Sequence, residues 1–266
     1  MNIQIKKFDP RKIEPNRIVL FIGKRNTGKS TLVKDILWHN RKIPMGMIMS
    51  PTEESNCFYQ SMVPDLFIYN DYDPVVIEKL IKRQKKCIRK GIKECNTFVL
   101  LDDCMYDSKR ITKDTNIRGI FMNGRHWKIF FLLTMQYCMD LSPDLRANID
   151  YIFILRENIL SNKEKIYKNF FGIFPNFDTF NQVMNSCTEN FECLVLDNTS
   201  RSNNIEDVVF WYKAKVRGNF KMGNSMFWKH HQKHYNRNYD IDDNDKEDPK
   251  TKGKKKETIV NVIKGR

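Results

Sequence analysis

Residues 17–38, RIVLFIGKRNTGKSTLVKDILW, constrain the fold more than any other stretch of this chain. An apolar run over 18–22 leads into a loop framed by Gly23 and Gly28, and Lys29 and Ser30 begin a helical pattern. The spacing G-x-x-x-x-G-K-S is that of the phosphate-binding P-loop, in which glycines let successive N–H groups turn inward around an anion. A buried strand, this loop and a helix together predict a parallel α/β sheet.

The P-loop predicts a nucleotide site, because the first turn of a helix offers unpaired N–H donors and the positive end of the helix dipole. Lys29 is expected to reach the β- and γ-phosphates, and the Ser30 hydroxyl is expected to bind Mg²⁺. The residues expected to contact the nucleotide are Gly23, Lys24, Arg25, Asn26, Thr27, Gly28, Lys29, Ser30 and Thr31.

Length and composition indicate one large α/β domain, or a core domain with a small appendage, in a reducing compartment. The chain has 266 residues, of which 41% are hydrophobic, enough for a packed core. No apolar run approaches the roughly 20 residues that cross a bilayer, and the first residues, MNIQIKKFDPRK, do not resemble a signal segment. Seven cysteines without a C-x-x-C pair favour free thiols over a disulfide or zinc framework.

Positive charge is concentrated in two segments. The net charge is +14, and residues 213–266 hold 15 Lys and Arg against 7 Asp and Glu. Residues 82–93, KRQKKCIRKGIK, hold seven basic residues and no acidic one. Both segments are candidate surfaces for a polyphosphate such as nucleic acid. The alternative for 82–93 is the solvated face of a helix. An anionic membrane is a weaker alternative, because no lipidation signal or amphipathic apolar face accompanies the charge.

Strand and helix patterns alternate through the first 155 residues, which predicts a mostly parallel sheet with helices on both faces. Strands are expected near 17–22, 46–50, 66–70, 97–102, 129–135 and 150–155, and helices near 29–39, 55–62, 75–90, 110–125, 161–171 and 175–188. Apolar runs at 192–197 and 207–213 predict a terminal hairpin or edge addition. The predicted domain is 1–235, with its core at about 15–215, and 236–266 is expected to be a charged, disordered tail.

A second motif, TFVLLDD at 97–103, is a buried strand that ends in two carboxylates. Asp102 is placed to hold the Mg²⁺ shell, as a Walker B aspartate does. Asp103 can polarise the attacking water as a general base. An Asp-rich turn is the alternative, but a P-loop about 70 residues upstream leaves room for two strand–helix units between the motifs.

The strand pattern at 129–135 ends at Gln136, in KIFFLLTMQ. P-loop ATPases with an inserted strand between the Walker A and Walker B strands carry a γ-phosphate sensor at the end of this neighbouring strand. Gln136 fits that role, and an ordinary strand terminus is the alternative.

The order GKRNTGKS, VLLDD, GRHWKIFFLLTMQ and LSPDLRANIDYIFILRE resembles the FtsK–HerA superfamily of DNA-pumping ATPases. Within it, the chain is most similar to the genome-packaging ATPases of nucleocytoplasmic large DNA viruses, over residues 15–215. The glutamine of the sensor strand and the LRAN-type segment narrow the choice. Many members carry Glu directly after the Walker B Asp, where this chain has Asp103, whose carboxylate reaches less far.

The resemblance implies a RecA-like, additional-strand core that hydrolyses ATP with Mg²⁺, assembles into a homo-oligomeric ring and translocates double-stranded DNA without regard to sequence. It further implies packaging of a viral genome, a capsid or portal-like anchor, and a place in the viral factory of the host cytoplasm or in the virion. Size favours a ring independently: a compact globule of this length has a radius of gyration of about 18 Å, too small to surround DNA.

Phosphoryl transfer gains from an arginine on the γ-phosphate, which a neighbouring subunit often supplies. Arg125, just before the sensor strand, is the first candidate for this arginine finger. Arg146 in DLRAN is the second and Arg118 the third.

Two other functions stay open from the residues. A P-loop kinase or small nucleotide-metabolising enzyme would need a lid segment with phosphate-binding arginines, and the chain shows no clear one. A non-catalytic nucleic-acid-binding protein would use ATP only to order its assembly. A GTPase is disfavoured, because Lys165 replaces the base-binding Asp in NKEK at 162–165. His230, His231 and His234 have a spacing that could bind zinc, but no fourth ligand is obvious.

Overall fold

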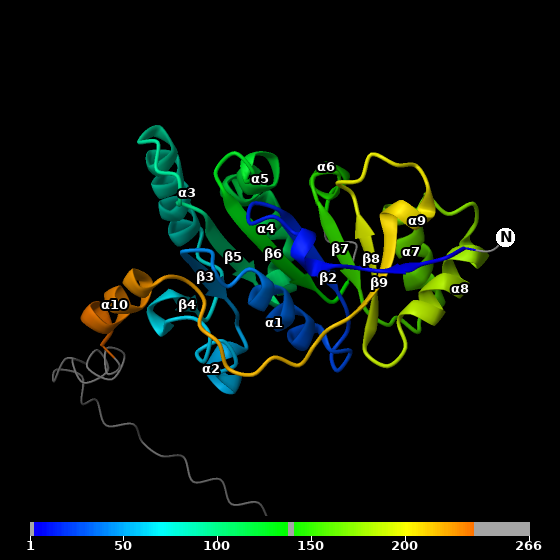
Figure 1. The fold of residues 1–266 in the computed structure, drawn as a ribbon, viewed down its shortest axis with the longest axis horizontal. Helices are drawn as coiled ribbons and strands as arrows, with labels where there is room; N and C mark the ends of the chain where they lie inside the picture. Colours follow the sequence, from blue (N-terminus) through cyan, green and yellow to red (C-terminus); the bar gives the residue numbers. More distant parts are fainter. Residues whose placement is uncertain (1–2, 138–140, 237–266) are drawn as a thin grey trace, which may run out of the picture.

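The computed structural model describes residues 3–137 and 141–236. Within this part of the chain, nine strands form one sheet, drawn with its helices in Figure 1. The spatial order is β1 (Lys6–Lys7), β9 (Val209–Lys213), β8 (Glu192–Asp197), β7 (Tyr151–Ile154), β2 (Ile18–Ile22), β6 (Ile129–Met135), β5 (Thr97–Leu101), β3 (Met45–Met49) and β4 (Ile68–Tyr69). In this sheet β8 runs antiparallel to β7 and β9, and the other neighbouring strands are parallel.

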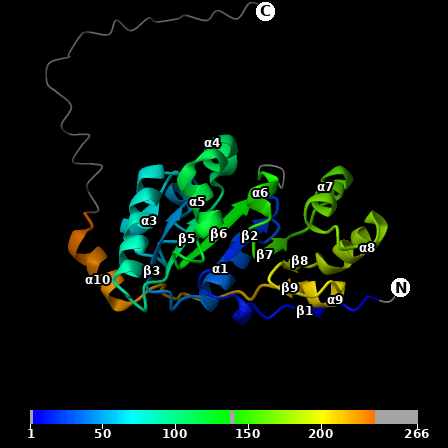
Figure 2. The same cartoon turned by 90° about the horizontal axis from the view of Figure 1, so that it is seen from above.

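Helices cover both faces of the sheet, as Figure 2 shows from above. They are α1 (Lys29–His39), α2 (Glu53–Asn56), α3 (Pro74–Arg89), α4 (Ser108–Lys113), α5 (Thr115–Asn123), α6 (Pro143–Arg146), α7 (Leu160–Phe170), α8 (Phe177–Cys187), α9 (Ile205–Val208) and α10 (Ser225–His234). Three short 3₁₀ helices, η1 (Pro10–Lys12), η2 (Asp65–Phe67) and η3 (Cys104–Asp107), join them.

The alternation of side chains along β2 divides the core into two layers. Ile18 and Leu20 pack in a cluster that contains apolar residues of α3, α5, α7 and α8. Val19 and Phe21 pack in a second cluster, which contains Leu32, Ile36 and other residues of α1. Every residue of β2, β5 and β6 is buried, because both faces of the parallel sheet are covered. The predicted α/β architecture is therefore confirmed.

The antiparallel pair β8–β9 confirms the predicted hairpin, and β1 pairs with β9 as the outer strand of the sheet. Two predicted helices differ from the structure. The helix expected over 55–62 is the single turn α2, which ends at Asn56 because the next residue, Cys57, adopts the left-handed region (φ 48°). The helix expected over 110–125 is divided at Asp114, whose carboxylate accepts the N–H groups of Asn116 and Ile117 and so begins α5. The predicted tail lies outside the described residues from 237 on.

Residues 214–224, which we call the strap, cross the outer face of α1 and connect β9 to α10 at the other end of the sheet (Figure 1). Asp35 of α1 is fully buried and fixes the strap at its start. Its carboxylate accepts hydrogen bonds from the Tyr212 hydroxyl (2.6 Å), the Lys215 N–H (2.9 Å) and Arg217 Nε (2.6 Å). These hydrogen bonds attach the start of the strap and the end of β9 to the helix that follows the P-loop.

Candidate nucleotide site

The loop between β2 and α1 has the backbone geometry of a phosphate cradle. Asn26 (φ 63°) and Gly28 (φ 95°) both adopt the left-handed region, which Asn tolerates and Gly favours. Thr27 Oγ1 donates to the Lys24 carbonyl (2.7 Å), which closes the loop on itself. A cavity of about 370 Å³ lies over the loop and is lined by Lys24, Arg25, Asn26, Gly28, Lys29, Ser30, Thr31 and Asp103.

The P-loop lysine meets the Walker B motif directly. The Lys29 ammonium, on a residue that is only 7% exposed, forms an ion pair with Asp103 Oδ1. The strand register explains the meeting, because β5 and β2 both pair with β6 in parallel and end at the same edge of the sheet. Asp103 lies in the left-handed region (φ 52°), which turns its side chain away from the course of β5. Two motifs that are 74 residues apart thus form one site.

Asp102, by contrast, is buried and held by two hydroxyl groups. Thr134 Oγ1 of β6 donates to Asp102 Oδ1 (2.7 Å), and the Tyr59 hydroxyl donates to Asp102 Oδ2 (2.8 Å). Thr134 Oγ1 also accepts the Asp103 N–H (2.9 Å) and so connects both carboxylates to the sensor strand. Burial raises the pKa of Asp102, while the two hydroxyl donors oppose that rise by favouring the charged form.

A second buried carboxylate fixes the segment that carries Tyr59. Glu53 is 1% exposed and accepts the N–H groups of Phe58 (3.1 Å), Tyr59 (2.7 Å) and Gln60 (3.0 Å). Burial raises the pKa of Glu53, and the three N–H donors act against that rise. Glu53 therefore positions Tyr59, and Tyr59 in turn positions Asp102.

Glu53, Tyr59 and Thr134 are functional-site residues that sequence reasoning missed. Thr134 had one available signal, because it is the single polar residue in the apolar strand of β6. For Tyr59 and Glu53 the sequence offers no such signal, because their connection to Asp102 depends on the path of the chain after β3.

Ser30 and Asp102, the expected metal ligands, offer the hydroxyl and carboxylate oxygens that Mg²⁺ prefers. Ser30 is exposed at the cavity, in the first turn of α1. Across 3–137 and 141–236, His, Cys, Asp and Glu form no group of three that could hold a metal. A Mg²⁺ ion held by these two residues would take its other ligands from phosphate and water.

Gln136 follows β6 at the same edge, where the Gly23 N–H donates to the carbonyl of Met135 (3.0 Å). Its side chain is exposed, next to the start of the P-loop. Glu157, after β7, holds the other side of the loop through Lys24 Nζ (2.6 Å). Burial raises the pKa of Glu157, but hydrogen bonds from Lys24, Ile159 N–H and Asn162 outweigh it and leave that pKa lowered.

The three candidate arginines do not line the P-loop cavity of their own chain. Arg125 lies at the amino edge of the sheet, where its Nη2 pairs with Asp150 Oδ1 (2.6 Å). Arg146 Nη1 donates to the carbonyl of Leu141 (2.6 Å), and Arg118 pairs with Asp144 (2.5 Å). A finger role for any of them therefore requires a second subunit.

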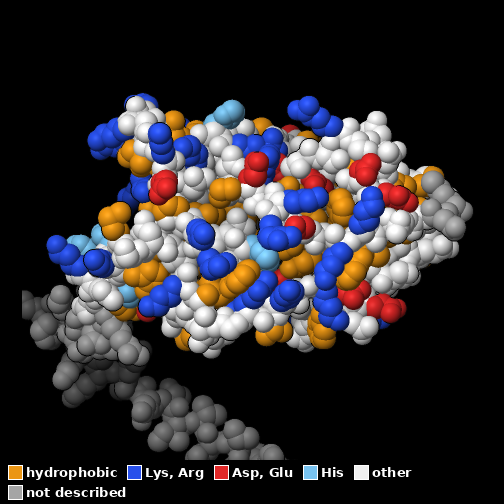
Figure 3. Space-filling view, in the orientation of Figure 1, with side chains coloured by type: hydrophobic (Ala, Val, Ile, Leu, Met, Phe, Trp, Pro, Cys, Tyr) orange, Lys and Arg blue, Asp and Glu red, His pale blue; other side chains and the backbone are white. Residues whose placement is uncertain are grey.

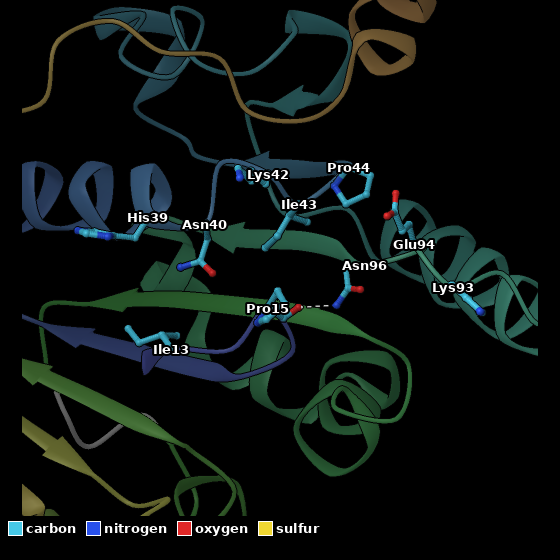
Figure 4. Close-up of a pocket in the computed structure, with 10 residues that line it drawn as sticks. All are labelled: Ile13, Pro15, His39, Asn40, Lys42, Ile43, Pro44, Lys93, Glu94 and Asn96. Carbon is cyan, nitrogen blue, oxygen red and sulfur yellow. Dashed lines mark hydrogen bonds between the residues drawn. The ribbon is translucent and has the colours of Figure 1, made fainter. Parts of the chain in front are cut away.

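A larger cavity, of about 580 Å³, lies at the amino edge and not at the P-loop (Figure 4). Residues that precede β2, β3 and β5 line it together with the end of α1, and Asn96 Nδ2 donates to the Pro15 carbonyl (2.9 Å) across it. It has no part in the arrangement of Lys29, Asp102 and Asp103.

The basic helix α3 and α10, the helix of the second basic segment, lie at one end of the described part of the molecule. A pocket bordered by Arg83, Cys87 and Ile92 on one side and by Met226 and His230 on the other shows that α3 and α10 are neighbours. Figure 3 shows Lys and Arg side chains gathered over these two helices. The exposed basic residues there are Lys79, Lys82, Lys85, Lys86, Arg89, Lys90, Lys93, Lys229 and Lys233. We call this surface the α3–α10 face.

None of the helices in the described part of the chain combines the length and the apolar character needed to span a bilayer.

Comparison with known proteins identifies the family. No model of a known protein family matches the chain. An uncharacterized protein of Acanthamoeba polyphaga mimivirus is 37% identical over 247 residues, which cover 90% of this chain and 87% of the relative. An uncharacterized protein of Invertebrate iridescent virus 6 is 37% identical over 248 residues, which cover 88% of this chain and 96% of that relative.

Among solved structures, the genome packaging NTPase B204 from Sulfolobus turreted icosahedral virus 2, in complex with AMPPCP, is similar with a TM-score of 0.54. The identity is 18%, and the match covers 76% of this chain and all of that one, so the likeness is one of fold. The chain therefore belongs to a family of proteins of large DNA viruses, and its fold is similar to that of a genome packaging NTPase.

Proposed function

We propose that the chain hydrolyses ATP and uses the energy to move double-stranded DNA into a viral capsid. The observation that carries this proposal is the ion pair between Lys29 of the P-loop and Asp103 of the Walker B strand, beside a buried Asp102. The similarity in fold to a genome packaging NTPase and the viral origin of the relatives support it.

In the proposed reaction, bound ATP competes with Asp103 for Lys29. The β- and γ-phosphates together carry more negative charge than one carboxylate, so the Lys29 ammonium moves to them and Asp103 is released. The freed carboxylate accepts a proton from a water molecule whose oxygen attacks the γ-phosphorus. The bond between that phosphorus and the β–γ bridging oxygen then breaks, and ADP and phosphate leave.

Asp102 and Gln136 have supporting roles in this proposal. Asp102 is held by Thr134 and Tyr59 and would bind Mg²⁺ together with Ser30. When bound, that ion neutralises charge on the β- and γ-phosphates. Gln136, exposed at the end of β6, would contact the γ-phosphate and report its loss.

The α3–α10 face is the proposed DNA surface. Its Lys and Arg side chains can neutralise phosphates without reading bases, which gives binding that is independent of sequence and weakened by salt. It lies at the β3–β4 end of the sheet, while the P-loop lies at the central strand β2, so ATP and DNA would not compete for space. A ring of subunits would then surround the duplex that one subunit can only touch.

The decisive experiment measures ATP hydrolysis with and without double-stranded DNA at several salt concentrations, with Lys29→Ala as the blank. We expect strong stimulation by DNA that fades as salt rises. The double variant Lys86→Glu/Lys90→Glu should lose much of the stimulation and should lower the salt slope of DNA binding by about 2, roughly one for each lost phosphate contact. Lys168→Glu on α7, which is exposed far from this face, is the matched control and should behave like the wild type.

Other outcomes would support other functions. Hydrolysis that ignores DNA and rises with a small phosphate acceptor would favour a P-loop kinase. ATP-dependent DNA binding that persists in Asp103→Asn, with no turnover in either protein, would favour a nucleotide-gated binding protein.

A further inference from the structure

Phe191 is the most exposed aromatic side chain among those that the structure describes, with 68% of its surface accessible. It follows α8 and directly precedes β8. Asn190 (φ 50°) and Phe191 (φ 63°) both adopt the left-handed region, which is unfavourable for non-glycine residues. A strained turn that exposes a large apolar ring to water is typical of a ligand-binding site, where a bound ligand would cover the ring.

The ring lies against the P-loop. A Cβ placed on Gly28 would be 3.2 Å from Cδ1 of Phe191 and 3.6 Å from its Cβ, so the ring packs on the residue that begins α1. The register explains this approach. Because β8 is antiparallel to β7, the start of β8 lies at the edge where β7 and β2 end. Phe191 is thereby placed beside the cavity lined by Gly28, Ser30 and Thr31.

The sheet order fixes the direction in which a nucleotide would lie. Asp102 and Asp103 follow β5, which is two strands from β2 on the side of β6. Phe191 precedes β8, which is two strands from β2 on the side of β7. A nucleoside triphosphate whose terminal phosphate faces Asp103 therefore extends its base toward Phe191.

We propose that Phe191 is a binding residue that stacks on the base of the nucleotide, an inference that rests on nucleotide binding by the P-loop. Aromatic rings stack on any base, because every base has a planar π-face, so Phe191 contributes affinity and little choice among bases. The exposed ring supplies one wall of a base site whose phosphate end is Lys29. The competing role is purely structural, in which the ring only covers Gly28 and stabilises the loop.

The test compares two ligands, ATP and inorganic tripolyphosphate, which carries the phosphates without a base. In Phe191→Ala, the Kd for ATP should rise roughly tenfold to a hundredfold, as loss of one stacked base predicts. The Kd for tripolyphosphate should stay at the wild-type value. Phe191→Leu, which keeps apolar cover over Gly28 without a π-face, should resemble Phe191→Ala. Met122→Ala, which removes an exposed apolar side chain of α5, is the control for loss of apolar surface.

Phe191→Trp provides an independent measurement. It should bind ATP as tightly as the wild type, and the fluorescence of the new indole should be quenched by ATP and not by tripolyphosphate. Equal weakening of both ligands in Phe191→Ala would overturn stacking in favour of the structural role, and unchanged ATP affinity would overturn it outright. If the wild-type protein bound neither ligand, nucleotide binding itself would be wrong and the stacking proposal would fall with it.

Discussion

At the scale of single residues, the two adjacent carboxylates after β5 differ because their contacts differ. Asp102 is 6% exposed and accepts two hydroxyl donors, which fix its orientation. Asp103 turns through a left-handed backbone and pairs with Lys29 at the cavity, where water has access. A fixed carboxylate suits a structural or metal-binding role, and an accessible one suits proton transfer. The shorter reach of Asp relative to Glu is sufficient for contact with Lys29.

Thr134→Val tests this division of roles, because it removes one hydroxyl from a fully buried position and keeps the shape of the side chain. Asp102 loses the donor at 2.7 Å, and the Asp103 N–H loses its acceptor at 2.9 Å. Loss of a hydrogen bond to a buried charge costs roughly 1.5–3 kcal/mol, which predicts a fall of about 10- to 100-fold in kcat.

Two quantities are measured for Thr134→Val. The kcat for ATP hydrolysis should fall, and the Kd for ATP should change little. Thr134→Ser, which keeps the hydroxyl, should retain most of the activity. A wild-type kcat in Thr134→Val would show that Asp102 does not need this donor.

At the scale of helices and strands, the sequence predicted those elements whose own apolar residues show that they are buried. Strands β2, β5 and β6 are apolar runs, and both β5 and β6 end at the residues assigned to the site. The strand β1 could not be predicted, since it consists of two exposed lysines with no apolar pattern. It pairs with β9 in parallel, and Lys7 Nζ lies over the Trp211 ring (5.3 Å to the centroid). The hairpin of β8 and β9 could be predicted, but the outer strand beside it could not.

The candidate site shows the same limit. Lys29, Asp102 and Asp103 follow from local motifs, and the structure brings Lys29 to Asp103 and places Asp102 beside them. Tyr59 and Glu53 come from a segment between β3 and β4 whose sequence has no motif. Their role depends on the hydrogen bond between Tyr59 and Asp102, which are 43 residues apart in the sequence. A local sequence pattern cannot predict such a tertiary contact.

The attachment of the strap to α1 is an element-scale device that should depend on pH. Arg217 stacks on Trp38 (3.6 Å to the ring centroid), and its Nη2 donates to His39 Nε2 (3.1 Å), which requires a neutral imidazole. Burial lowers the pKa of His39 from its ordinary value of 6.5, with Asp35 opposing that change and Arg217 and Arg41 adding to it. The unfolded chain therefore binds this proton more readily than the folded one, so the contribution of His39 to stability is present above pH 6.5 and is lost as pH falls below it.

We therefore expect the melting temperature of the protein to fall between about pH 7.5 and pH 5.5, and to fall less in His39→Gln, which has no titrating ring. The measurement is thermal unfolding by circular dichroism at both pH values. His126→Gln removes an exposed histidine elsewhere and is the control. An identical pH dependence in wild type and His39→Gln would rule out His39 as the titrating group at the strap.

At the scale of the whole molecule, none of the three candidate finger arginines lines the P-loop cavity of its own chain. The cavity over the P-loop is lined by Lys24, Arg25 and Lys29, whereas Arg125 lies at the opposite edge of the sheet, with half of its side chain exposed. Its partner Asp150 is buried and also contacts Arg17 Nη1 (3.4 Å) and the Ile18 N–H (2.9 Å). Asp150 would thus keep partners if Arg125 turned outward toward the P-loop of a neighbouring subunit, as a ring would allow.

A mixing experiment tests whether Arg125 acts between subunits. Arg125→Ala alone should bind ATP and fail to hydrolyse it, and Lys29→Ala alone should do neither. When the two variants are mixed before assembly, an Arg125→Ala subunit with an intact P-loop can border a Lys29→Ala subunit with an intact Arg125. With random mixing in equal amounts, about a quarter of the interfaces have this pairing, so about a quarter of the wild-type rate should return. Arg17→Ala, which also removes a cation from Asp150, is the control and should keep turnover if Arg125 acts as a finger and not through Asp150. If the mixture were as inactive as its components, the role of Arg125 would be structural and confined to its own subunit. The main reason to expect that one chain completes the active site of the next would then be gone.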